Sequence, residues 1–145
     1  MLRALLAAFF LCVGSFPLYA DSISVSGDPG TLIVNTAIAG SQPPFVEDAT
    51  TTYSVVTTPA NMKITGNLNL VMPTNTILRI TLQAPTGATS LGAVLLTPAA
   101  KDLVTGIPAL TNQGALSITH RLSAIVLAGV ISSSSRTITL TLTEI

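Results

Sequence analysis

The clearest pattern in the chain is strict alternation of aliphatic residues and threonines near its C-terminal end. Residues 137–143 read Thr-Ile-Thr-Leu-Thr-Leu-Thr, so Ile138, Leu140 and Leu142 share one face and the threonines share the other. A helix would scatter these residues around its circumference, whereas a period of two is that of a half-buried strand. The pattern therefore predicts a last strand over 136–143.

Less regular alternation predicts more strands upstream. Proline, glycine and asparagine clusters punctuate the chain between them, and no segment has a helical period. These features predict an all-β fold, an antiparallel immunoglobulin-like β-sandwich of about 7–9 short strands, with a small closed barrel as the alternative. The candidate strands are 31–38, 53–58, 62–70, 77–83, 92–97, 101–105 and 115–126, with a weak one at 22–26. In 62–70 the alternation is interrupted at Gly66, which we interpret as a bulge.

The first twenty residues have the layout of a secretory signal peptide. Arg3 supplies a positive start, Leu5–Val13 is unbroken apolar sequence, and Ala20 suits the residue before cleavage. The apolar run is shorter than the roughly 20 residues that a membrane anchor needs, and no later run is long enough either. We therefore expect an exported, extracellular or cell-surface protein that is not integral to the membrane. Its mature form would have no cysteine, because Cys12 is removed.

The mature sequence divides by composition near residue 48. We interpret 1–20 as the signal peptide, 21–48 as an N-terminal extension with a possible donor strand at 31–38, and 49–145 as the sandwich domain. In the alternative interpretation, 31–38 is simply the first strand of the sandwich.

Charge and composition argue against several functions. Six Lys/Arg residues and six Asp/Glu residues give a net charge of zero, so no basic patch for nucleic acid is expected. The one histidine, His120, falls on the apolar face of its strand with Ile118 and Leu122, and we expect it at an edge or strand end with a satisfied ring nitrogen. A calcium site at Glu47-Asp48 is a minor alternative. We expect no catalytic residue, no metal site and no cofactor.

Several short stretches resemble small exported bacterial β-sandwich proteins. They are 84–90, 101–107, 122–124, 128–130 and 136–139. More loosely, 50–145 is similar to pilin subunits of chaperone–usher systems and to spore-coat-U-like subunits. The chain departs from the common pilins in lacking a disulfide and in having Glu144, where an aromatic residue is usual.

The resemblance implies a non-enzymatic structural subunit of a fimbrial surface fibre or coat. An extended segment that leaves its own domain can pair with the open sheet edge of a neighbour. The donor strand would be 31–38, with the side chains of Leu32, Val34, Thr36 and Ile38 facing inward, and the strand carrying Ile138, Leu140 and Leu142 would flank the acceptor groove. The implied partners are further copies, other surface subunits and a periplasmic chaperone. The alternatives are a monomeric secreted or periplasmic adhesion module that recognises a protein or glycan through its loops, and, more remotely, a hydrolase using His120.

Overall fold

The computed structural model describes residues 20–36 and 39–145. Of the predicted signal peptide only Ala20 is therefore described, and Ile38 of the predicted donor strand also lies outside the described residues. In the described part of the chain, no helix is long and apolar enough to cross a membrane. The helical element found there is the three-residue 3-10 turn Val126–Ala128.

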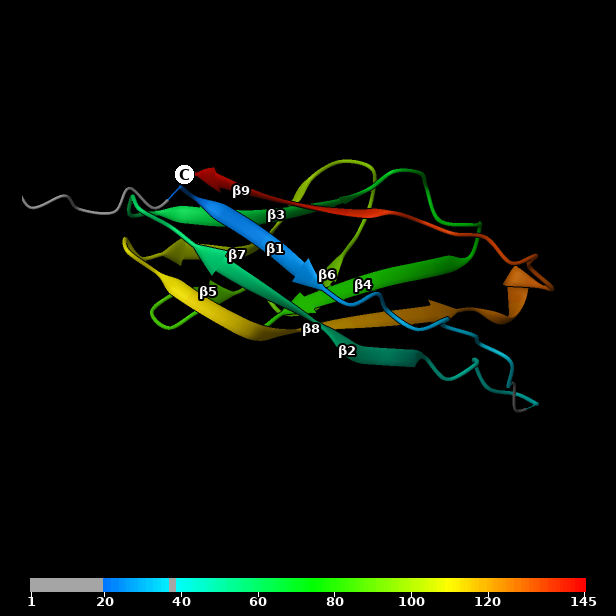
Figure 1. Ribbon diagram of the computed structural model, residues 1–145. Coiled ribbons are helices and arrows are strands. Elements are labelled where there is room, and N and C mark those ends of the chain that lie inside the picture. The colour runs from blue at the N-terminus through cyan, green and yellow to red at the C-terminus, as the bar shows by residue number, and fades with distance from the viewer. Residues whose placement is uncertain (1–19, 37–38) are drawn as a thin grey trace, which may run out of the picture.

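The described residues form an all-β fold of two antiparallel sheets (Figure 1). The first sheet, sheet A, has the order β1 (Ser22–Ser26), β2 (Val46–Val56), β8 (Asn112–Ala124), β4 (Thr76–Leu82) and β6 (Val94–Leu95). The second, sheet B, has the order β5 (Thr89–Ser90), β7 (Lys101–Ile107), β3 (Met62–Leu68) and β9 (Ile138–Glu144).

The core lies between the two sheets and follows the predicted alternation. Sheet A contributes the inward side chains of β2, β8 and β4, and sheet B contributes those of β3 and β7. In β3, Met62, Ile64 and Leu68 are 4%, 0% and 1% exposed, while Lys63, Thr65 and Asn67 face outward. Burial of this aliphatic layer is the main stabilising contribution available to a chain whose described residues contain no cysteine.

Gly66 is explained by close packing between strands of sheet B. A Cβ atom at this position would lie 2.6 Å from Leu103 Cδ1 and 3.4 Å from Leu140 Cδ2. The irregularities in the β3–β7 ladder fall just before it, between Met62 and Thr65. The absence of a side chain at Gly66 therefore makes room for the two leucines. The irregular β3–β7 register lies in the residues just before the glycine.

Two expected strands differ from the structure. Residues 31–36 of the predicted strand 31–38 have no strand partner among the described residues. Their side chains alternate as in a strand, but their backbone forms no hydrogen-bonded ladder with another strand. Of 92–97 only Val94–Leu95 pair, with Arg79 and Ile80 of β4. The weak prediction at 22–26 is a full strand, β1, which pairs with Thr52–Val56. The boundary expected at 48/49 falls inside β2.

Candidate functional site

The outer edge of β9 is the starting point for a functional site. Among the described residues β9 pairs only with β3, from Met62↔Glu144 to Leu68↔Ile138, so its second edge has no strand partner. Its inward side chains, Ile138, Leu140 and Leu142, are packed against the core but remain half-buried. The corresponding residues of β3 are almost fully buried. The sandwich is therefore less completely covered along β9 than at its centre.

A groove opens between β9 and the inner face of sheet A. β1 lies near the C-terminal end of β9 and then runs obliquely away from it (Figure 1). The diverging strands leave two adjoining hollows of about 660 Å³ and about 360 Å³. We call the two together the groove; both hollows are lined by Pro29, His120, Arg136 and Ile138. Volumes of this order suit a small molecule or a short peptide segment.

The predicted donor segment lies against this groove in its own subunit. We call residues 27–36, which connect β1 toward β2, the strap. Residues 31–34 line the larger hollow; of these, Leu32 and Val34 are half-buried, whereas Ile33 is 57% exposed. Thr36 is exposed. The side chains thus alternate as in a strand, with the even-numbered Leu32 and Val34 facing the groove.

Asp48 holds the strap to sheet A. The β2–β8 register shifts between Asp48 and Thr51, which adds a residue to β2 at this point. The Asp48 carboxylate accepts hydrogen bonds from the backbone N–H of Thr50 at 3.1 Å and from its hydroxyl at 2.8 Å. With a further backbone hydrogen bond from Gly30, these bonds hold the pKa of Asp48 below its usual value. The sequence does not signal this bulge and therefore gives no indication that Asp48 anchors the strap.

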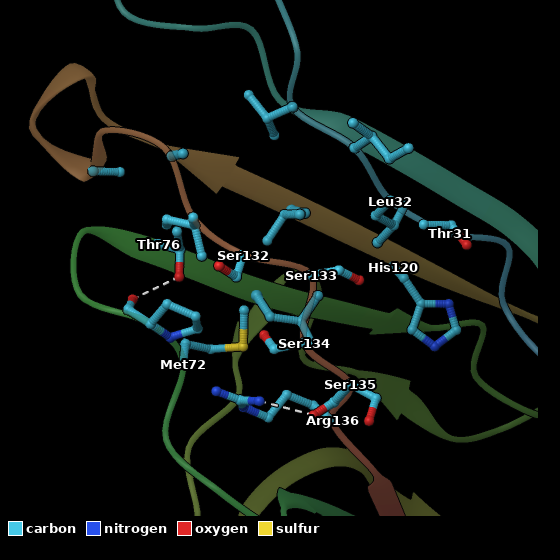
Figure 2. A pocket seen from close by; sticks show the side chains of 18 of the residues that line it. Thr31, Leu32, Met72, Thr76, His120, Ser132, Ser133, Ser134, Ser135 and Arg136 are labelled. Atoms are coloured by element: carbon cyan, nitrogen blue, oxygen red, sulfur yellow. Dashed lines mark hydrogen bonds between the residues drawn. The ribbon is translucent and has the colours of Figure 1, made fainter.

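His120 differs from the sequence-based expectation in two ways. It lies in β8, which is flanked by β2 and β4, and so is not on an edge strand; it pairs with Asp48 and Ile80. It is 4% exposed, and its Nδ1 atom has no hydrogen-bond partner. Figure 2 shows its imidazole directed from the sheet into the space beside Ser135 and Arg136. Its expected position on the apolar face is confirmed.

Lowering the pH is expected to destabilise the fold through His120. Burial lowers the pKa of His120 below 6.5, and the Asp48 carboxylate together with a hydrogen bond to the Asp48 backbone offsets only part of this effect. The unfolded chain therefore takes up a proton at a pH where the folded chain does not, and the free energy of unfolding should fall as the pH is lowered through 6.5. Denaturant titrations above and below this pH measure the change.

A matched variant isolates that effect. His120→Gln cannot titrate, and the chain has no other histidine, so the slope near this pH should disappear. The depressed pKa of Asp48 acts at lower pH, where its stabilising contribution is lost as the carboxylate becomes protonated. A slope that persists in His120→Gln would contradict the assignment.

Glu47 and Asp48 do not converge on a shared cation. Adjacent strand residues point to opposite faces. Asp48 bonds Thr50, while Glu47 forms an ion pair with Arg121, Nε to Oε1 2.6 Å, and Arg121 lies over the Phe45 ring. No group of three or more His, Cys, Asp or Glu side chains suited to a metal ion occurs among the described residues.

Two loops carry exposed apolar side chains, which we call the apolar tip. They are Leu70 and Val71 from the β3–β4 loop and Val126, Leu127 and Val130 from the β8–β9 loop. The loops are joined by the Asn75 side-chain amide, which donates to the Leu127 carbonyl, and by Arg136, which donates to the Val71 carbonyl. Leu127 is 77% exposed. Large exposed apolar side chains gathered in this way mark a contact surface.

Comparison with known proteins adds no relative: no family model, no curated protein and no solved structure matches the chain.

Proposed function

We propose that this chain is a non-enzymatic structural subunit of a bacterial surface fibre or coat, which assembles by β-strand exchange. In this proposal the fold is an immunoglobulin-like sandwich with an unfilled strand position beside β9. The observation that carries it is the unpaired outer edge of β9, together with half-buried Ile138, Leu140 and Leu142 above the groove. An extended segment in that position would gain backbone hydrogen bonds along β9 and bury alternate side chains.

The same chain supplies a segment suited to that position. In the strap, Leu32 and Val34 alternate with exposed Ile33, and residues 31–36 have no strand partner among the described residues. Such a segment loses no ladder of its own when it leaves its subunit. A free sheet edge and an unpaired alternating segment are complementary, and they occur together here. Natural proteins usually protect long free edges, because these promote association.

The proposal places the protein outside the cell membrane, as the signal-peptide pattern of Met1–Ala20 predicts. Further copies and other surface subunits would be its partners, with a periplasmic chaperone covering the groove before assembly. Such a chaperone would prevent premature association of the free edge.

Mixed single-cysteine variants test strand exchange directly. The chain from Asp21 onward has no cysteine, so an introduced thiol has no background. Protein with Asn35→Cys is mixed with protein that has Thr139→Cys or Thr141→Cys and a tag of a different length, so that a mixed dimer can be recognised by its size. All three positions are exposed. Strand exchange is expected to give a disulfide-linked heterodimer under mild oxidation, since Asn35 and the β9 threonines would share an outward face.

Ala99→Cys, exposed in the β6–β7 connection, serves as the matched control. Equal cross-linking of Asn35→Cys to all three partners, or to none of them, would contradict strand exchange. Deleting 21–48 is a poorer test, because it removes β1 and the first residues of β2.

The apolar tip favours a second candidate, a monomeric secreted adhesion module that binds through its loops. Its exposed Leu127 and Val130 could contact a protein partner. The two candidates separate by light scattering of residues 21–145. A subunit that exchanges strands is expected to form multimers that persist on dilution, and a binding module to remain monomeric.

A further inference from the structure

The groove contains two buried polar atoms that have no partner. Among the described residues, Thr51 Oγ1 and His120 Nδ1 are the buried side-chain polar atoms without a hydrogen bond. Both residues line the smaller hollow. The same hollow is lined by Ile80, Ile118 and Leu140, which offer no hydrogen bond, and by the polar residues Asp28, Arg136 and Thr137, none of which bonds either atom. Buried polar atoms in native proteins are normally paired, so two unpaired ones in one hollow point to an absent polar group.

The arrangement of the strands explains why both atoms face the groove. Thr51 pairs with Ile118, two residues before His120 on β8, and both side chains lie on the inner face of sheet A. The bulge after Asp48 brings Thr51 into phase with the inward residues Tyr53 and Val55. Both polar atoms therefore belong to strands of sheet A, Thr51 to β2 and His120 to β8, and neither lies in a loop.

The predicted donor segment 31–38 has one polar residue at its even-numbered positions. In the even-numbered series Leu32, Val34, Thr36 and Ile38, only Thr36 carries a hydroxyl. A threonine hydroxyl can donate one hydrogen bond and accept others. Its chemistry suits both groove atoms, because it can donate to His120 Nδ1 and accept from the Thr51 hydroxyl. In its own subunit Thr36 is exposed.

We infer that Thr51 and His120 form a register site, which receives the Thr36 hydroxyl of a second copy of this chain. The inference rests on the proposed strand exchange and adds the alignment of the inserted segment. Side chains on one face of a strand are two residues apart, so a slip of two residues would put Val34 or Ile38 against the two polar atoms. The groove atoms would stay unpaired, and Thr36 would lie among aliphatic side chains. The hydroxyl thus selects one register.

Thr36→Val tests the site with little risk to folding, because Thr36 is exposed in the free subunit. Valine keeps the shape and removes the hydroxyl. In multimers of residues 21–145, exchange of fluorescently tagged subunits is expected to be about tenfold faster for Thr36→Val than for the unaltered chain. Thr36→Ser retains the hydroxyl and should exchange close to the original rate. Thr31→Val is the matched control, because Thr31 is likewise exposed and does not line the smaller hollow.

A second readout reports His120 itself. In chains with nitrogen-15 in the imidazole, the Nδ1 resonance is expected to shift on assembly in the unaltered protein and in Thr36→Ser, but not in Thr36→Val. If Thr36→Val behaves like Thr31→Val in both measurements while Asn35→Cys still cross-links to β9, the register site is wrong and strand exchange stands. Absence of that cross-link overturns both.

Discussion

Replacement of Val34 by aspartate is expected to abolish assembly. Val34 is half-buried against the groove in its own subunit and would be more deeply buried in a neighbour's groove. An unpaired carboxylate there would lose its hydration among apolar side chains, which costs several kcal/mol. By light scattering, residues 21–145 with Val34→Asp should remain monomeric at concentrations where the unaltered chain forms multimers.

Ile33→Asp provides the control for that experiment. Ile33 precedes Val34 but is 57% exposed, so an aspartate there keeps contact with water. Assembly should persist in Ile33→Asp, and both variants should show the far-ultraviolet circular dichroism of the unaltered chain. Persistent assembly of Val34→Asp would show that the strap is not the exchanged segment.

Among the substitutions proposed for this protein, Ile64→Ala is expected to lower the free energy of unfolding the most. Ile64 is 0% exposed in the middle of β3, where it pairs with Val104 of β7 and Leu142 of β9. Truncation would remove buried methyl groups and leave a cavity between the sheets, for a cost of about 2–5 kcal/mol. This is a large part of the roughly 5–15 kcal/mol that stabilises a typical domain. Urea unfolding followed by circular dichroism measures the change.

Lys63→Ala, one residue earlier, is the comparison. Its side chain faces outward and forms an ion pair with Asp102, Nζ to Oδ1 3.1 Å, in which both groups are partly exposed. Loss of such a pair should cost less than about 1 kcal/mol. Similar losses in the two variants would mean that the layer between the sheets is not the main source of stability.

Sequence alternation predicted the strands that have one buried and one exposed face. The alternating 137–143 corresponds to β9, 115–126 to β8, and 77–83 to β4, each within a few residues. For these strands the side-chain pattern is imposed directly by burial of one face. The face of His120 could be predicted for the same reason.

Features that depend on the partner strand could not be predicted in this way. Residues 31–36 have strand-like side chains, but a ladder needs a neighbouring backbone, and no pattern within one segment reports whether that neighbour exists. The bulge after Asp48 likewise depends on the partner strand, because three residue steps along β2 are paired with two steps along β8. One signal for Thr51 was available, since its two-residue spacing from Tyr53 and Val55 puts a hydroxyl on an otherwise apolar face.

The pairing of β3 with β9 also has a consequence for the order in which the fold can form. Met62 is paired with Glu144, and Leu68 with Ile138, so this edge of β3 must wait for a strand that is synthesised about 70–80 residues later. Closing such long loops is slow, because the entropy is lost before the contacts are gained. A chain emerging from a ribosome cannot complete sheet B before β9 is released. Until then, the backbone N–H and C=O groups along that edge of β3 have no ladder partner, and this free edge can associate with other chains.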